Sequence, residues 1–159
     1  MSRPPYEPVK GTRRLRHGRF SSQYQIYHIT TATYQRRKVF DNFIAGRAVV
    51  NALRRASRFG QADTLAFVVM PDHLHWLMQL TGNKQLSVTV KTVKSLSARV
   101  INQARGYQGP VWQKGYFDRG LRRDADVVTI ARYMITNPIR AGLVKTVGDY
   151  PLWDAIWIC

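Results

Sequence analysis

The sequence is nearly free of cysteine, poor in acidic side chains and without a long apolar run. Its single cysteine is Cys159, so a disulfide framework and a cysteine-based zinc site are excluded. No apolar run approaches the roughly 20 residues that a bilayer-spanning helix requires, and no apolar stretch follows the basic N-terminal residues. We therefore expect a soluble protein of a reducing compartment, without a membrane partner.

Basic residues far outnumber acidic ones: 25 Lys and Arg stand against 9 Asp and Glu, a formal net charge of +16 over 159 residues. Hydrophobic residues make up 45% of the chain, which suits one packed core and argues against general disorder. The surplus of positive charge predicts a polyanionic partner, most directly a nucleic acid. An anionic membrane is the weaker interpretation, because no basic amphipathic helix stands alone.

Residues 1–22 predict a basic N-terminal arm, in which three prolines oppose helix formation. Arg13, Arg14 and Arg16 are its densest group of cations, and we expect them to contact the nucleic acid. A solvated tail without a role is the alternative interpretation.

Strands and helices follow one another in the rest of the chain. Segments rich in apolar, β-branched and aromatic residues predict strands at 24–34, 65–70, 73–80 and 111–117. Apolar residues at helical spacing predict helices at 41–58, 85–104 and 124–137. Ile44 and Val100 belong to the expected buried stripes of the first two helices.

This order contains the split βαβ pattern and predicts an α+β, ferredoxin-like sandwich, in which an antiparallel sheet carries helices on one face. The third helix is an addition that must dock somewhere on this sandwich. Residues 23–145 are expected to form the main domain, and 146–159 an aromatic C-terminal tail that folds back onto it.

His73 and His75 are the first candidates for chemistry. Side chains at i and i+2 of a strand point the same way, with Cα atoms roughly 6.5–7 Å apart, so two such imidazoles can close on one divalent ion. The intervening Leu74 points into the core. Two unrelated surface or core histidines are the alternative, and a two-histidine metal site would need further ligands.

Tyr133 and Asn137 lie four residues apart, on one face at the end of the third predicted helix. Tyr133 stands at the edge of the apolar stripe, as an amphipathic aromatic with a wet hydroxyl or as a nucleophile that attacks phosphorus. Two interpretations of Asn137 are open: a neutral oxygen ligand for a metal, or a helix cap before Pro138.

Other cations stand where they could meet a phosphate. Arg119 could clamp one, with Asp118 holding it in place, or the two could form a plain surface ion pair. Arg140 begins a tight turn that suits close approach of the backbone to a phosphate, and Lys91 and Lys94 lie on a polar helical stripe.

Three blocks together resemble one family. They are MPDHLH at 70–75, WQKGYFDR at 112–119 and YMITNPIRAGLV at 133–144. In this order and spacing they resemble the single-tyrosine HUH transposases of bacteria, and most closely the REP-associated tyrosine transposases. The resemblance extends over about residues 24–144, and its third block is the most specific. It departs at Asp72, where an asparagine is common.

The resemblance implies that His73, His75 and Asn137 bind a catalytic Mg²⁺ or Mn²⁺ and that Tyr133 is the nucleophile. Ligand type alone would equally suit Zn²⁺ or Ni²⁺. The family cuts single-stranded DNA by transesterification through a 5′-phosphotyrosine link, and its REP-associated members recognise hairpin-forming repeats. The expected partner is thus single-stranded or hairpin DNA, in the nucleoid of a bacterial cytoplasm, with the protein a monomer or a homodimer.

Two other functions use the same residues. A non-catalytic nucleic-acid-binding domain on the same scaffold would need only the cations and the aromatic side chains. A metal-dependent phosphoesterase of another type would need more acids near the histidines, where Asp72 stands alone.

Overall fold

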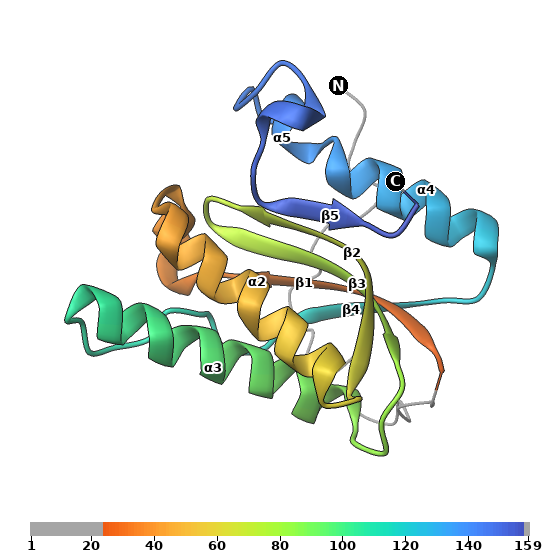
Figure 1. Cartoon of the computed structure of the whole chain (residues 1–159), viewed down its shortest axis with the longest axis horizontal. Helices are drawn as coiled ribbons and strands as arrows, with labels where there is room; N and C mark the ends of the chain where they lie inside the picture. The colour runs from red at the N-terminus through yellow and green to blue at the C-terminus, as the bar shows by residue number, and fades with distance from the viewer. Residues whose placement is uncertain (1–23, 158–159) are drawn as a thin grey trace.

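The computed structural model describes residues 24–157, so Arg13, Arg14 and Arg16 of the expected arm lie outside the described residues. Within them, five strands form one antiparallel sheet in the order β4-β1-β3-β2-β5 (Figure 1). The strands are β1 (Ile26–Ala32), β2 (Ala62–Met70), β3 (His73–Leu80), β4 (Phe117–Leu121) and β5 (Trp153–Ala155). The first four have the order of a ferredoxin-like sandwich, which confirms the predicted fold class.

The β2–β3 hairpin occupies the middle of the sheet. Pro71 and Asp72 form its turn, which pairs Met70 with His73, and β1 adds to the other side of β3 with Ala32 opposite His73. Strands β2 and β3 are apolar because they are covered on both faces.

Helices α2 (Phe43–Arg58) and α3 (Leu86–Arg105) cover one face of the sheet and pack against each other (Figure 1). The Asn42 side chain caps α2 by accepting from the backbone N–H of Ala45. Gly106, at φ 61°, ends α3 in the left-handed conformation that glycine adopts without strain.

The prediction that Ile44 and Val100 are buried is wrong: 67% and 49% of their surfaces are exposed. Ile44 belongs to the first turn of α2, ahead of the residues that the sheet covers. Val100 is one position away from the buried stripe through Ser97 and Ile101, which turns it by about 100° toward solvent.

Helix α4 (Asp124–Ile135) lies across the opposite face, over β2 and β5 (Figure 1). Its buried residues Val127, Ile130, Ala131 and Met134 form a second core cluster with the sheet. The helix ends two residues earlier than predicted. A short helix, α5 (Asn137–Arg140), then begins after Thr136, and Pro138 lies within it, near a helix start where its missing N–H costs no hydrogen bond.

The fourth strand begins at Phe117, so the prediction of a strand at 111–117 is wrong. Trp112 makes only an isolated bridge to Thr33, and Gly115 turns the chain at φ 79°. The Lys94 ammonium donates to the carbonyls of Gln113 (2.7 Å) and Gly115 (2.6 Å), which holds this segment as an irregular loop.

The C-terminal segment completes the sheet by adding β5 antiparallel to β2. The Tyr150 hydroxyl donates to the carbonyl of Val69, and Leu152 is buried against Gly46 of α2. No helix within residues 24–157 is long and apolar enough to cross a bilayer.

Candidate active site

The two strands β1 and β3 bring three histidines together on the face that α4 partly covers. Alternation along β3 puts His73 and His75 on this face and Leu74 in the opposite core, as predicted. The imidazole centroids of His73 and His75 are 4.9 Å apart and nearly perpendicular. His28, on β1, stacks on His75 with ring centroids 5.2 Å apart.

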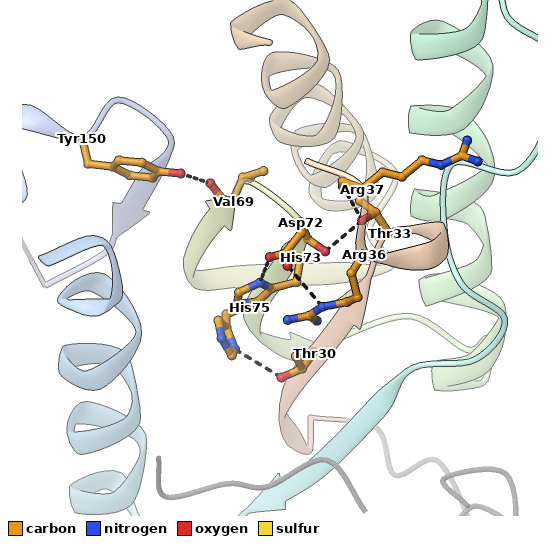
Figure 2. A network of polar contacts seen from close by, with 9 residues as sticks. All are labelled: Thr30, Thr33, Arg36, Arg37, Val69, Asp72, His73, His75 and Tyr150. Carbon is orange, nitrogen blue, oxygen red and sulfur yellow. Dashed lines mark hydrogen bonds and ion pairs between the residues drawn. The ribbon is translucent and has the colours of Figure 1, made fainter. Parts of the chain in front are cut away.

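An acid and an arginine stand behind His73 (Figure 2). Asp72 accepts from His73 Nδ1 at 2.6 Å through one carboxylate oxygen, and its other oxygen lies 3.1 Å from Arg36 Nε. A carboxylate on Nδ1 fixes the tautomer of an imidazole and leaves Nε2 as the atom with the free lone pair.

His75 is fixed in the same way by neutral partners. Its Nδ1 lies 3.1 Å from His28 Nε2 and 3.2 Å from Thr30 Oγ1, so one N–H at this position can be shared between two acceptors. Nε2 of His75 is again left as the donor of a lone pair.

All three histidines are held neutral. Burial lowers the pKa of His75 well below its usual value, and the charges of His73, His28, Arg140 and Arg36 lower it further. Burial also lowers the pKa of His73, although Asp72 opposes this shift. Burial and then the charge of Arg119 lower the pKa of His28 to about 4. A neutral imidazole is the form that binds a metal.

These donors fit a divalent ion. Nε2 of His73 and of His75 and the side-chain amide of Asn137 make no hydrogen bond to any residue in 24–157, so two nitrogens and one amide oxygen are available. The same part of the chain contains no group of three or more His, Cys, Asp or Glu side chains arranged to hold a metal. An ion here would depend on the imidazoles and the amide, with open positions for another ligand.

Tyr133 and Asn137 come from the helices on the same face, at the end of α4 and the start of α5. Arg140 lies beside the tyrosine. Its guanidinium carbon lies 3.7 Å from the centroid of the Tyr133 ring, and it donates to the Tyr133 carbonyl at 2.6 Å and to the Thr136 hydroxyl. Its charge also helps to lower the pKa of His75, as a lesser cause than burial. Tyr133 and the imidazoles therefore lie on the same face of the sheet within a single chain, with Arg140 next to the tyrosine.

The other predicted DNA-binding residues occupy different places. Arg119 is exposed on β4 directly opposite His28, so it belongs to the histidine face. Asp118, next to it on the strand, pairs with Ile29, whose side chain belongs to the core on the other face of the sheet. Lys91 is exposed on α3, across the sheet from the histidines, and Lys94 supports the loop before β4.

Sequence reasoning missed His28, Thr30 and Arg36. The first two could have been found from the sequence, because they alternate on β1 as polar residues of one face. In the structure His28 is only 3% exposed. Arg36 gave no signal, since its position depends on a turn whose backbone conformation the sequence did not indicate.

That turn is strained. Gln35 and Arg36 both have φ 55°, a left-handed conformation that costs a residue other than glycine about 1–2 kcal/mol. An ion pair as exposed as Arg36–Asp72, with 54% of the arginine side chain exposed, contributes only about 0.2–1 kcal/mol. The ion pair alone therefore does not offset the strain, and strained residues of this kind gather at functional sites.

Comparison with known proteins points to one family. Two curated relatives are similar over part of their length. A Haemophilus influenzae protein whose name assigns it to the REP-associated tyrosine transposases is 27% identical over 99 residues, 56% of this chain and 56% of its own. A REP-associated tyrosine transposase of Escherichia coli is 26% identical over 102 residues, 64% of this chain and 59% of its own. The match thus spans less than two thirds of either relative.

Two solved structures share the fold. A REP-associated tyrosine transposase bound to a REP hairpin superposes with a TM-score of 0.68, at 22% identity, over 85% of this chain and 79% of that one. A proposed transposase from Deinococcus radiodurans gives a TM-score of 0.53, at 26% identity, over 73% of this chain and 92% of that one. The profile of the IS200-like transposases matches residues 21–137, which include both histidines, Tyr133 and Asn137. The expected resemblance is confirmed, and the chain belongs to the IS200-like transposase family.

Proposed function

We propose that this chain is a metal-dependent enzyme that nicks and rejoins single-stranded DNA next to hairpins, with Tyr133 as its nucleophile. The family and the likeness to a transposase bound to a REP hairpin support a substrate of this kind. The observation that carries the proposal is that α4, which bears Tyr133, packs on the face of the sheet that bears His73 and His75. Arg140 adds a cation beside the candidate nucleophile, with its guanidinium carbon 3.7 Å from the centroid of the Tyr133 ring.

The reaction is one exchange of ester bonds. The Tyr133 Oη bonds to phosphorus as its proton passes to solvent, and the bond from phosphorus to the 3′ oxygen breaks. The released 3′ oxygen takes up a proton from water. The products are a 5′-phosphotyrosine link and a free 3′-OH, so a second 3′-OH can reverse the step and join strands without a nucleotide cofactor.

A Mg²⁺ or Mn²⁺ held by His73, His75 and Asn137 would offset the negative charge that grows on the nonbridging phosphate oxygens. The protein supplies the rest. Burial keeps the imidazoles neutral, Asp72 and His28 orient them, and Arg119 and Arg140 attract the DNA backbone to the histidine face.

The test is covalent capture. We would incubate the protein with Mn²⁺ and a library of single-stranded oligonucleotides that each carry one hairpin between randomised flanks. Adducts that survive denaturation and gel electrophoresis reveal both the activity and the preferred sequence. Wild type should form such an adduct, and Tyr133→Phe should form none while it still binds the selected oligonucleotide.

Tyr107→Phe is the matched control, because Tyr107 is exposed just after α3 and its hydroxyl accepts a hydrogen bond from the exposed Arg37. It should form the adduct as wild type does. Equal adduct from wild type and Tyr133→Phe would contradict the assignment of the nucleophile. EDTA should stop adduct formation and spare binding, and failure of EDTA to do so would remove the metal from the proposal.

A non-catalytic DNA-binding domain is the second candidate. It is favoured by one observation: helices α2 and α3 carry basic residues and no acidic ones along their whole length. Binding of the hairpin library without any covalent adduct, in the presence of Mn²⁺, would select this function instead.

A further inference from the structure

The strained turn after β1 carries Arg36 to the edge of the histidine site. The turn is held from both sides: the backbone N–H of Arg36 donates to the carbonyl of Thr33, and the Thr33 hydroxyl donates to the carbonyls of Arg37 and Asp72. Thr33 is fully buried. The left-handed conformation of Gln35 and Arg36 is therefore held by fixed neighbours.

Only one edge of the Arg36 guanidinium is used inside the protein. Nε lies 3.1 Å from Asp72, whereas Nη1 and Nη2 make no hydrogen bond or ion pair with any residue in 24–157. The side chain is 54% exposed, and Figure 2 shows its guanidinium beside His73 and His75. Its charge also adds to the lowering of the pKa of both imidazoles, as the smallest of the causes.

We infer that Arg36 is a catalytic residue that donates from Nη1 and Nη2 to a nonbridging oxygen of the phosphate attacked by Tyr133. This inference rests on the proposed function and extends it. Asp72 and the strained turn fix the guanidinium in advance, so it stabilises the charge of the transition state without rearranging. A guanidinium matches two oxygens of a phosphate or binds one through two N–H groups, which a lysine cannot reproduce.

A phosphate contact by Arg36 and a purely structural role for Arg36 predict different effects of its loss. If the arginine served only to hold Asp72, its loss would act through His73 and would weaken metal binding. If it touches phosphate, its loss slows the chemical step and leaves the affinity for metal largely intact. The two roles therefore separate in one set of measurements.

The experiment compares wild type with Arg36→Gln and Arg36→Lys. The rate of adduct formation is measured at saturating DNA with the hairpin oligonucleotide that the wild-type capture selects. Mn²⁺ affinity is measured on the same proteins without DNA. Arg36→Gln should slow adduct formation by about 10²–10³-fold, as expected for the loss of one donor to a developing oxyanion, and Arg36→Lys should recover little of that loss. Both variants should keep Mn²⁺ affinity within about threefold of wild type, below the range expected when an outer contact of a metal ligand is lost.

A phosphorothioate at the scissile position, prepared as separate Rp and Sp isomers, identifies the oxygen. One isomer should slow the wild type and have no further effect on Arg36→Gln. Arg58→Gln is the matched control, because Arg58 is an exposed cation at the C-terminal end of α2, on the face of the sheet opposite the histidines, and it should form adduct at the wild-type rate.

The following results would contradict the inference. An unchanged rate in Arg36→Gln, or a loss of rate matched by an equal loss of Mn²⁺ affinity, would overturn the phosphate contact while the proposed function stands. Absence of any adduct with wild type would overturn both.

Discussion

Asp72 should set the affinity of the site for metal, and its replacement by asparagine gives a measurable loss. The carboxylate accepts a hydrogen bond from His73 Nδ1 at 2.6 Å, and its other oxygen forms an ion pair with Arg36 Nε at 3.1 Å. An asparagine of the same shape has one accepting oxygen and one donating NH₂ group. Asp72→Asn can therefore satisfy His73 or Arg36, but the other donor then faces an N–H.

The size of the loss follows from these contacts. Removing an outer partner of a ligating histidine weakens metal binding by about 10–100-fold. Asp72→Asn keeps one acceptor, so its metal affinity should fall by about tenfold, or about 1.4 kcal/mol. Asp72→Ala keeps no acceptor, so its metal affinity should fall by nearly 100-fold.

The assay is a Mn²⁺ titration of the DNA-free protein, followed by the electron paramagnetic resonance signal of the free ion. Asp63→Asn is the control, since Asp63 is exposed near the start of β2, at the other end of the strand from Asp72. It should bind Mn²⁺ as wild type does. Wild-type affinity in both Asp72 variants would refute the outer-contact reasoning.

Three further predictions concern stability and binding. Burial lowers the pKa of His28 from 6.5 to about 4, so as the pH falls the unfolded chain takes up a proton on this residue before the folded protein does. His28 alone should therefore lower the free energy of unfolding by about 3 kcal/mol between pH 6.5 and 4. Urea denaturation should show that His28→Gln loses about 3 kcal/mol less than wild type over this pH range; identical pH profiles would contradict the prediction. A Cβ on Gly46 would meet Leu152 Cδ1, so Gly46→Ala should destabilise by about 1–3 kcal/mol, and the same change should cost less in a Leu152→Ala background; strictly additive effects would contradict the packing of the C-terminal segment. The affinity for single-stranded DNA should fall with salt at a log–log slope of about −0.7 for each phosphate contacted, and an affinity independent of salt would contradict a cationic binding face.

The sheet and the histidine pair were predictable because they depend on short-range periodicity. Alternation along β3 alone places His73 and His75 on one face and Leu74 in the core. The same rule applied to β1 would have added His28 and Thr30 to the site. The prediction of β1 rests on its β-branched and aromatic residues and does not assign them to the two faces, so it does not include His28 and Thr30.

Errors arose where distant contacts override local sequence. The segment 111–117 is apolar and aromatic, yet it forms a loop because Lys94, from α3, occupies the carbonyls of Gln113 and Gly115. Arg36 reaches Asp72 only because Thr33 fixes two left-handed residues after it. Neither arrangement has a signature in the residues that adopt it.

The placement of the third helix decides whether there is a site at all. The sequence left its docking face open, and burial of Val127, Ile130, Ala131 and Met134 against the sheet puts it on the histidine face. Only then do Tyr133 and Asn137 belong with His73 and His75.

The central claim is that the phenol of Tyr133 forms a phosphodiester bond with the DNA. Peptide mapping of the captured adduct by mass spectrometry tests it most directly. After digestion by protease and nuclease, the account predicts one peptide that contains Tyr133 and carries a nucleotide through its 5′ phosphate. A nucleotide on any other residue, or attachment through a 3′ phosphate, would contradict it.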